Sequence, residues 1–365
     1  MQAIPHPVPK TDSPKPVLAL LQRLTERMPN RLKAHGEVLW FFLSRILPLM
    51  LSTRRRPVLF SRYMALGDVI CAFPAALELK KRHPGAAFIF HCRKDYNCLP
   101  RLGGVTTHMV DHLNVPLIED KYSFLFAAIY KFTYSDENEN CPAKEAVVAE
   151  FCRQHQVPIA ENHPRLETDP AAVVQVKAIL KQHQLDNGPL IVIHPGPTWI
   201  VREWPLTAWT QLVQGLMDAG YKNIVQLGSG QAGTVGSALD KPIPGVVSLV
   251  NKLTLEETIA LISLSKLLAG IDSGLLHIAA AVRTPAIGIF GPTSAQFRFG
   301  PAACVTSVAG AVDCQGCHHR VPRLHWITGC PHDVVCMKSI TPDRVLQSCK
   351  SILEPAVQPP ALVPH

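Results

Sequence analysis

Charged residues are scarce in this sequence, and long apolar runs are missing. Of its 365 residues 18% are charged and 47% are hydrophobic, which excludes an intrinsically disordered chain and supplies enough apolar material for two cores. No uninterrupted apolar stretch approaches the roughly 20 residues of a transmembrane helix. No G-x-G-x-x-G pattern follows the first predicted strand, which disfavours a NAD-dependent dehydrogenase.

The excess of basic over acidic residues is concentrated at the start of the chain. The formal net charge is +8, which alone would suggest an acidic partner. Residues 1–57 contain ten basic residues and three acidic ones, so the rest of the chain is nearly neutral. We therefore expect no nucleic acid partner for the main body.

The cysteines suggest a reducing compartment. There are eleven of them, an odd number in a chain too long for a disulfide-stapled domain, and this favours the cytoplasm. No signal peptide is expected at residues 1–16, which are rich in proline and lack an apolar core.

Four of the cysteines form a separate pattern near the end of the chain. Histidines stand among them, so a structural, tetrahedral zinc site is chemically possible, but scattered buried thiols are common and we favour no metal cofactor. The cysteines are Cys314, Cys317, Cys330 and Cys336, and the histidines are His318, His319 and His332.

The stretch Val38–Leu51 is the most membrane-like part of the sequence, although it is shorter than a span and contains Arg45. As a helix it has one narrow polar stripe and is otherwise apolar, and Arg54-Arg55-Arg56 follows. Such a helix either lies in an anionic membrane surface, through residues 38–56, or packs on the protein's own core. Residues 1–56 are thus predicted to be a basic extension with an amphipathic helix.

From residue 57 onward, short apolar runs alternate with helical segments, which predicts an α/β fold with parallel sheets. We expect two Rossmann-like domains facing each other across a cleft, at residues 57–180 and 181–341. A helix is expected at 342–354 and a disordered tail at 355–365. The expected strands are Val58–Phe60, Ala87–His91, Leu190–Ile193, Ile224–Leu227, Val246–Val250, Leu267–Ile271 and Ala286–Phe290.

Ligands of such sheets bind beyond the carboxyl ends of the strands. The loops that follow the predicted strands should therefore line the site, and their glycines let a ligand approach the backbone closely. These loops contain Gly67 with Asp68, Gly196, Gly228, Asp272 and Gly291.

The segment from Ile271 to His277 predicts a strand, a Ser-Gly turn and a helix. Ser273 and Gly274 would leave backbone N–H groups pointing at a phosphate, with His277 as a further donor and Asp272 accepting from sugar hydroxyls. The alternative is that Asp272 and Ser273 only cap the helix.

Two further loops carry candidate side chains. Thr198 could donate to a phosphate oxygen and Arg202 could bind phosphate, although a solvated surface arginine is the ordinary interpretation. Trp204 is expected to be a packing residue. Asp68 could act as a general base on a hydroxyl nucleophile, and it could also be the N-cap of a helix that starts at Val69.

Three segments together resemble glycosyltransferase family 9, the lipopolysaccharide heptosyltransferases. They are SRYMALGDVICAFPAALELKKRHP at 61–84, HPGPTWIVREWP at 194–205, and 253–301 with GIDSGLLHIAAAVRTPAIGIFGPT inside it. They occur in the family's order and spacing. The resemblance implies a glycosyltransferase B fold with the acceptor in the first domain, a nucleotide sugar such as ADP-heptose in the second, and inversion without a metal ion.

The resemblance also assigns roles to residues. Asp68 matches the family's general base, and Thr198 and Arg202 match contacts to the donor phosphates, with arginine in place of the family's usual lysine. Asp272, Ser273, Gly274 and His277 match the segment that holds the sugar and the diphosphate, and Leu253 matches the position against adenine. The helix at 342–354 resembles one that crosses back onto the first domain.

The sequence therefore predicts a glycosyltransferase that uses a nucleotide-sugar donor and a lipid-linked saccharide acceptor, such as a lipopolysaccharide core, at the cytoplasmic face of the inner membrane. Two alternatives are a nucleotide-sugar epimerase or hydrolase on the same fold, and a non-catalytic nucleotide-sugar-binding protein.

Overall fold

The computed structural model describes residues 30–134, 143–158, 163–196, 199–229, 243–299, 304–320 and 330–354. The chain forms two compact units, which we describe separately. The first contains Met1–Val58, Gly85–Ala87 and His112–Ile129, and the second contains Leu59–Pro84, Phe88–Asp111 and Tyr130–His365. The domain boundaries and the tail expected from the sequence stay predictions, and the tail lies outside the described residues.

The first unit contains a long helix near the N-terminus. It consists of α2 (Asn30–Phe41), a π-helical stretch (Phe42–Ile46) and α3 (Leu47–Thr53). Side-chain bonds tie it to the segment with α7 (Val115–Lys121), since His35 Nδ1 lies 2.5 Å from the Tyr122 hydroxyl and Arg56 donates to the Phe124 carbonyl at 3.0 Å.

One face of this helix packs on the protein, as one of the two expectations has it. Another face is apolar and exposed, which is the face that the membrane expectation requires. Val38, Phe41 and Ile46 are buried, whereas large apolar side chains elsewhere on the helix are exposed: Leu32, Leu39, Trp40, Leu43 and Leu51. The helix is also longer than expected, because Leu32–Thr53 has the length and apolar composition to cross a membrane. The prediction that it is too short to span was wrong, since the helix continues on both sides of the apolar stretch.

The first sheet has the order β3-β2-β1-β4. Its strands are β1 (Val58–Ser61), β2 (Phe88–His91), β3 (His108–Val110) and β4 (Ala128–Lys131). The predicted helical stretch up to Arg82 is two helices, α4 (Leu66–Cys71) and α5 (Phe73–Lys81), and Pro74 stands in the first turn of the second. The helices α6 (Cys98–Leu102) and α9 (Val147–Gln154) complete this part of the chain.

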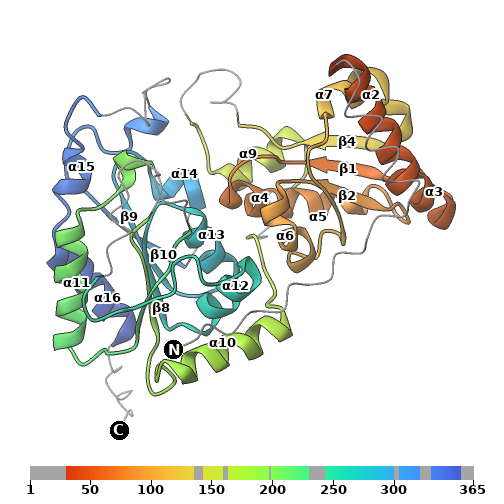
Figure 1. Ribbon diagram of the computed structural model, residues 1–365. Coiled ribbons are helices and arrows are strands. Elements are labelled where there is room, and N and C mark those ends of the chain that lie inside the picture. The colour runs from red at the N-terminus through yellow and green to blue at the C-terminus, as the bar shows by residue number, and fades with distance from the viewer. Residues whose placement is uncertain are drawn as a thin grey trace, which may run out of the picture. The chain divides into compact units, whose positions relative to one another are not determined.

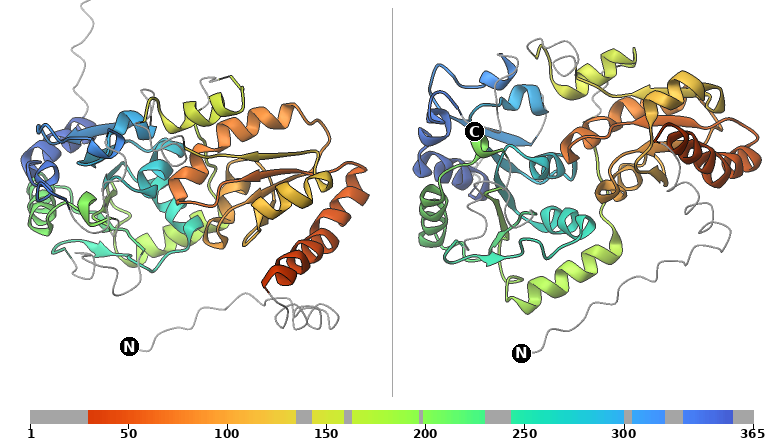
Figure 2. Two further views of the ribbon diagram at one scale, coloured as in Figure 1. Left: turned by 90° about the horizontal axis from the view of Figure 1, so that it is seen from above. Right: turned by 45° about the horizontal axis from the view of Figure 1, so that its top comes forward.

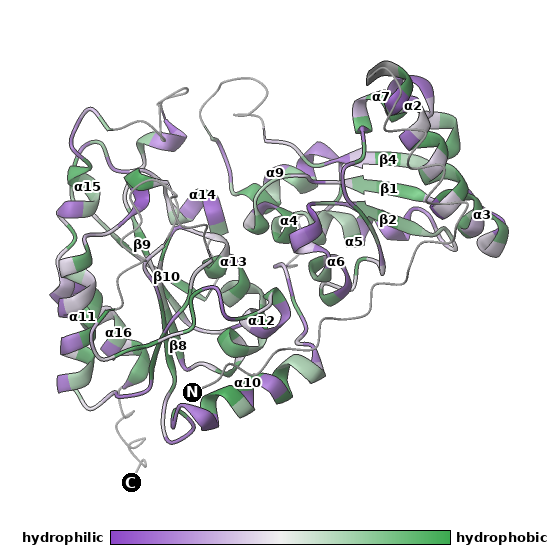
Figure 3. Ribbon diagram, in the orientation of Figure 1, coloured by the Kyte–Doolittle hydropathy of each residue, from purple (hydrophilic) through white to green (hydrophobic). Residues whose placement is uncertain are grey.

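The second sheet has six strands, all parallel, in the order β10-β9-β8-β5-β6-β7. They are β5 (Ile191–His194), β6 (Ile224–Gln226), β7 (Val247–Ser248), β8 (Leu267–Ile271), β9 (Ala286–Phe290) and β10 (Val305–Ala309). The central strand β8 is buried along its whole length and hydrophobic throughout (Figure 3). Burial on both faces is the reason that such strands are continuous apolar runs in the sequence.

Helices cover both faces of this sheet, with α11 (Leu206–Asp218) and α16 (Pro342–Leu353) on one face and α12 (Leu255–Leu264) and α13 (Gly274–Ala281) on the other (Figure 1). The further views show the same covering (Figure 2). Thr254 followed three residues later by Glu257 is a sequence pattern that predicts a capping box, and the structure forms one there at the start of α12. The remaining helices are α10 (Pro170–Gln182), α14 (Ala295–Phe299) and α15 (Val335–Lys338).

The last helix does not go where the resemblance implies. Instead of crossing to the first sheet, α16 buries Val345 and Cys349 in the same apolar cluster as α11. Gly215 of α11 makes this possible, because a Cβ there would lie 2.6 Å from Leu346. Two buried residues at i and i+4 give the helix one apolar face, and the second sheet takes that face.

Candidate active site

The loops after four neighbouring strands of the second sheet meet at one edge. Gly196 follows β5, Gly228 follows β6, Asp272 follows β8 and Gly291 follows β9. This confirms the predicted arrangement, since the carboxyl ends of parallel strands share an edge. Gly196 has φ +143°, a conformation that needs glycine. Thr198, two residues further, lies outside the described residues.

The Ser-Gly turn after β8 starts α13 as predicted. Ser273 is the N-cap, and its hydroxyl accepts from the Leu275 N–H at 3.3 Å. Gly274 is the first helical residue. The capping role expected as the alternative is therefore confirmed for Ser273. It was wrong for Asp272, which does not cap the helix.

Asp272 instead pairs with two arginines. Its Oδ2 lies 3.5 Å from Arg202 Nη1 and 3.5 Å from Arg298 Nε. All three side chains are nearly inaccessible, at 11% for Arg202, 12% for Arg298 and 3% for Asp272. The solvated interpretation of Arg202 was therefore wrong. The cluster brings two guanidinium groups and one carboxylate together where little water reaches them.

Both ionised forms in this cluster depend on the pairing. Burial opposes ionisation of Asp272, but the charges of Arg202 and Arg298 outweigh it and hold the pKa of its carboxyl well below the ordinary value. Burial lowers the pKa of Arg202 to about 10, and Asp272 opposes that shift. Trp199 supports the same guanidinium, whose Cζ lies 3.8 Å from the indole ring centroid.

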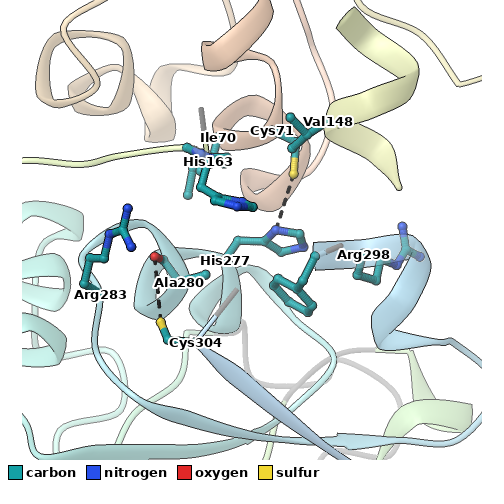
Figure 4. A pocket seen from close by; sticks show the side chains of 11 residues that line it. Ile70, Cys71, Val148, His163, His277, Ala280, Arg283, Arg298 and Cys304 are labelled. Atoms are coloured by element: carbon teal, nitrogen blue, oxygen red, sulfur yellow. Dashed lines mark hydrogen bonds between the residues drawn. The ribbon is translucent and has the colours of Figure 1, made fainter. Parts of the chain in front are cut away.

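His277 lies one turn into α13 and is buried. Its Nδ1 is 3.4 Å from Cys71 Sγ of α4, and its ring stacks near Phe299 with centroids 4.4 Å apart. Figure 4 shows its side chain pointing toward Cys71, in a pocket that Arg298 also lines. Burial lowers the pKa of His277 to about 4 and raises that of the Cys71 thiol well above its ordinary value. Both side chains are therefore uncharged in the folded protein, with Sγ and Nδ1 within hydrogen-bond distance.

Asp68 lies in the first turn of α4, and its carboxylate is held at both oxygens. Arg62 Nη2 donates to Oδ2 at 3.1 Å, and the Tyr134 hydroxyl donates to Oδ1. The N-cap of α4 is Ala65, so the interpretation of Asp68 as an N-cap was wrong. Arg62 is 2% exposed and the Asp68 side chain 14% exposed, so Asp68 is the accessible member of the group.

Two glycines allow α4 to pack directly against α13. A Cβ on Gly67 would lie 2.4 Å from the His277 ring, and a Cβ on Gly274 would lie 2.8 Å from the Leu66 side chain. Atoms cannot approach so closely, so these positions exclude any side chain. The absence of Cβ atoms brings the helix with Asp68 and the helix with His277 into contact.

Three further residues singled out in the sequence, Trp204, Leu253 and Gly291, lie as follows in the structure. Trp204 is a packing residue as expected, being 1% exposed with its indole N–H donating to the Ile340 carbonyl at 2.9 Å. Leu253 lies half-buried in the turn before α12, and its role toward adenine stays a prediction. Gly291 lies against α15, where a Cβ would be 2.4 Å from Met337 Sδ.

Sequence reasoning missed Arg62, Tyr134 and Arg298. Arg62 directly follows a predicted strand and Arg298 follows the Gly-Pro-Thr loop after β9, so their positions were available signals. Tyr134 follows β4, a strand that was not predicted.

The preference for no metal ion at the four C-terminal cysteines stays a prediction. Among the residues that the structure describes, which include all four, no group of three or more His, Cys, Asp or Glu side chains could hold a metal ion. Burial raises the pKa of Cys336 to about 11, and the thiols of Cys314, Cys317 and Cys330 add to this shift.

Comparison with known proteins gives consistent matches. The family model of glycosyltransferase family 9 (heptosyltransferase) matches residues 128–326. Lipooligosaccharide heptosyltransferase 2 of Haemophilus influenzae is 33% identical over 142 residues, which are 37% of this chain and 41% of that protein. The chain therefore spans less than half the length of this curated relative.

Solved structures show the same fold. The ADP-heptose lipopolysaccharide heptosyltransferase II of Escherichia coli matches with a TM-score of 0.59 at 19% identity, over 81% of this chain and 98% of that one. The iron-containing dodecameric glycosyltransferase TibC of enterotoxigenic E. coli matches with a TM-score of 0.63 at 20% identity, over 82% and 76%. The fold is thus that of the glycosyltransferase B enzymes.

Proposed function

Because this chain belongs to glycosyltransferase family 9, the heptosyltransferase family, we propose that it is an inverting glycosyltransferase. Its expected donor is a nucleotide sugar, heptose from ADP-heptose, and its expected acceptor is a lipopolysaccharide core or a related glycan. The heptosyltransferase relatives support the class of reaction. The residues of the site support its mechanism.

One observation supports this function above the others. The helix that carries the accessible carboxylate of Asp68 packs against the helix that carries His277, with Cys71 Sγ and His277 Nδ1 3.4 Å apart. The charge of Asp68 reaches both His277 and Arg202. A proton acceptor therefore stands next to a site suited to a diphosphate, as a displacement on a nucleotide sugar requires.

The proposed reaction is a single displacement. Asp68 accepts the proton of the acceptor hydroxyl while that oxygen bonds to the anomeric carbon. The bond from the anomeric carbon to the diphosphate oxygen breaks, and its electron pair leaves with the nucleoside diphosphate. Arg202, Arg298 and His277 stabilise the developing charge, together with the start of α13 at Gly274, and such a donor commonly contributes about 3 to 4 kcal/mol.

Replacement of Asp68 tests this function. In assays with ADP-heptose and a truncated lipopolysaccharide acceptor, Asp68→Ala should abolish measurable transfer and leave nucleotide affinity, by calorimetry, within about twofold. Asp111→Asn is the matched control, because this carboxylate likewise accepts from a tyrosine, the Tyr63 hydroxyl at 2.6 Å. Substantial turnover by Asp68→Ala would remove the base assignment.

The products of the same assay separate the alternatives. A new glycosidic bond on the acceptor supports transfer. Release of free sugar or of an epimer without acceptor would identify a hydrolase or an epimerase. Nucleotide-sugar binding without turnover would identify a binding protein.

We propose that transfer needs no metal ion, since two guanidinium groups can carry the charge compensation that a metal would supply. Activity should survive excess EDTA, and the purified protein should contain zinc and iron below one equivalent. Loss of activity with EDTA that a divalent cation restores would contradict this proposal.

We also propose that the protein works at the cytoplasmic face of the inner membrane and contacts anionic lipid through residues 38–56. The exposed side chains of Leu39, Trp40 and Leu43 lie on the N-terminal helix, and Arg54-Arg55-Arg56 follows it. An in-plane position suits this helix, because Val38, Phe41 and Ile46 are buried on the protein.

Vesicle sedimentation tests the membrane contact. Binding should require anionic lipid, and Leu39→Ser with Leu43→Ser should reduce the bound fraction severalfold, whereas the exposed control Ser52→Ala should not. Equal binding of the double variant would contradict the contact. Resistance to carbonate extraction from cells would identify a membrane-spanning helix instead.

A further inference from the structure

Arg62 occupies a position that joins three parts of the second unit. It directly follows β1, and its side chain is 2% exposed. Nη1 donates to the Phe132 carbonyl at 2.9 Å, just past β4, and Nη2 donates to Asp68 Oδ2 at 3.1 Å in the first turn of α4. Because the guanidinium is planar and rigid, these two bonds fix the position of one carboxylate oxygen relative to both strands.

Tyr134 fixes the other oxygen. Its hydroxyl donates to Asp68 Oδ1, and its side chain is buried. Burial raises the pKa of Tyr134 well above its ordinary value, so the phenol keeps its proton at all pH values at which the enzyme would work. A protonated phenol beside a carboxylate acts as a hydrogen-bond donor.

Ring packing holds these two donors in place. The Arg62 Cζ lies 4.4 Å from the Tyr134 ring centroid and 5.4 Å from that of Phe151 on α9. The Tyr134 and Phe151 rings are themselves stacked, with centroids 5.4 Å apart. The cation and both rings therefore form one stack with few alternative arrangements.

We propose that Arg62 and Tyr134 are positioning residues that hold the Asp68 carboxylate in the orientation required to accept the acceptor's proton. Both act through Asp68, because they are buried while the Asp68 side chain remains 14% exposed. A carboxylate with a donor on each oxygen cannot rotate freely, so the orientation of its remaining lone pairs is set before the substrate arrives. This inference rests on the proposed role of Asp68 as the base.

Tyr134→Phe is the decisive variant, because it removes the hydroxyl and keeps the ring in the stack. We expect kcat to fall about 10- to 100-fold while KM for the donor and nucleotide affinity stay within twofold. The acidic limb of the kcat–pH profile should also move, since one donor to the carboxylate is lost. A purely structural role would lower the melting temperature and leave the pH profile of the folded enzyme unchanged.

Arg62→Lys tests whether both guanidinium donors, Nη1 and Nη2, are needed. It keeps a positive charge but cannot bond the Phe132 carbonyl and Asp68 with fixed geometry, so kcat should fall by at least as much as in Tyr134→Phe. Tyr63→Phe is the control, since that phenol donates to Asp111 at 2.6 Å, and its kcat and pH profile should match those of the unmodified enzyme.

The outcomes separate this inference from the proposed function. If Asp68→Ala is inactive while Tyr134→Phe and Arg62→Lys keep normal kcat values and pH profiles, the positioning role is overturned and the base assignment stands. If Asp68→Ala retains full transfer activity, the base assignment fails and the positioning role fails with it. A kcat loss in Tyr134→Phe without a change in KM or fold supports the inference.

Discussion

Two aspartates of the site, the partly exposed Asp68 and the buried Asp272, are paired with arginine in different proportions. Asp68 has one guanidinium and one phenol, so its cluster carries no net charge. Asp272 lies between two guanidinium groups, so its cluster carries one positive charge. A cluster with an accessible carboxylate suits a proton acceptor, whereas one with a second guanidinium group suits a diphosphate. Charge balance thus separates the roles of two residues with identical side chains.

The largest expected effect follows from removing the carboxylate that balances two arginines. Asp272→Asn removes the carboxylate that lies between two nearly inaccessible guanidinium groups, which should cost about 3 to 5 kcal/mol of unfolding free energy. Asp68→Asn should cost about 1 to 3 kcal/mol, because Arg62 keeps the Phe132 carbonyl as a partner. Urea unfolding of the two variants measures the difference, and equal losses would contradict the contrast in charge.

A smaller effect is expected where the two helices of the site touch. Gly67→Ala places a Cβ 2.4 Å from the His277 ring, and such overpacking costs about 1 to 3 kcal/mol. The loss should shrink in a His277→Ala background, where the ring is absent. A double-mutant cycle of unfolding free energies tests this, and an additive cycle would show that the glycine is not needed for the contact.

Arg298 should matter for the diphosphate. Arg298→Gln should weaken ADP binding about tenfold, equivalent to about 1.4 kcal/mol, and weaken AMP binding less. Arg283→Gln is a matched control, because Arg283 lines the same pocket but is exposed. Calorimetric titrations with ADP and AMP measure both. Equal losses for the two nucleotides would argue against a role toward the second phosphate.

The last expected effect concerns pH. Burial lowers the pKa of His277 from 6.5 to about 4, so the unfolded chain takes up a proton before the folded one does. The stability that this histidine contributes is fully present above pH 6.5 and falls as the pH drops toward 4, by at most about 1.4 kcal/mol per pH unit. His277→Gln should therefore flatten the pH dependence of unfolding free energy between pH 6.5 and 4. An unchanged slope would contradict the shift.

Features set by local sequence were predicted well. The bounds of β8, β9 and α16 agree with the structure, and so does the capping box of α12. Continuous burial makes these strands apolar runs, and the capping box depends on residues three apart. By contrast β3 and β4 were missed, since each is short and their residues are half-buried or exposed. A strand without a buried face leaves little signal in the sequence.

The candidate site was predicted in position but not in its pairings. Loops after strands were expected to meet, and those of Gly196, Gly228, Asp272 and Gly291 do. The partners of the carboxylates lie far along the chain, since Asp68 and Tyr134 are 66 positions apart. Such pairs depend on tertiary packing, which no local pattern encodes.

The hydrogen bonds of Arg62 and Tyr134 make the orientation of the Asp68 carboxylate depend on a segment that comes later in the chain than Asp68 itself. Both the Phe132 carbonyl and the Tyr134 hydroxyl come from residues just past β4. A fragment that stops before this strand would still contain the aspartate, yet that side chain would be free to rotate. Catalytic competence would then report the docking of a single edge strand, and among destabilised variants turnover would be expected to fall as hydrogen exchange in β4 rises.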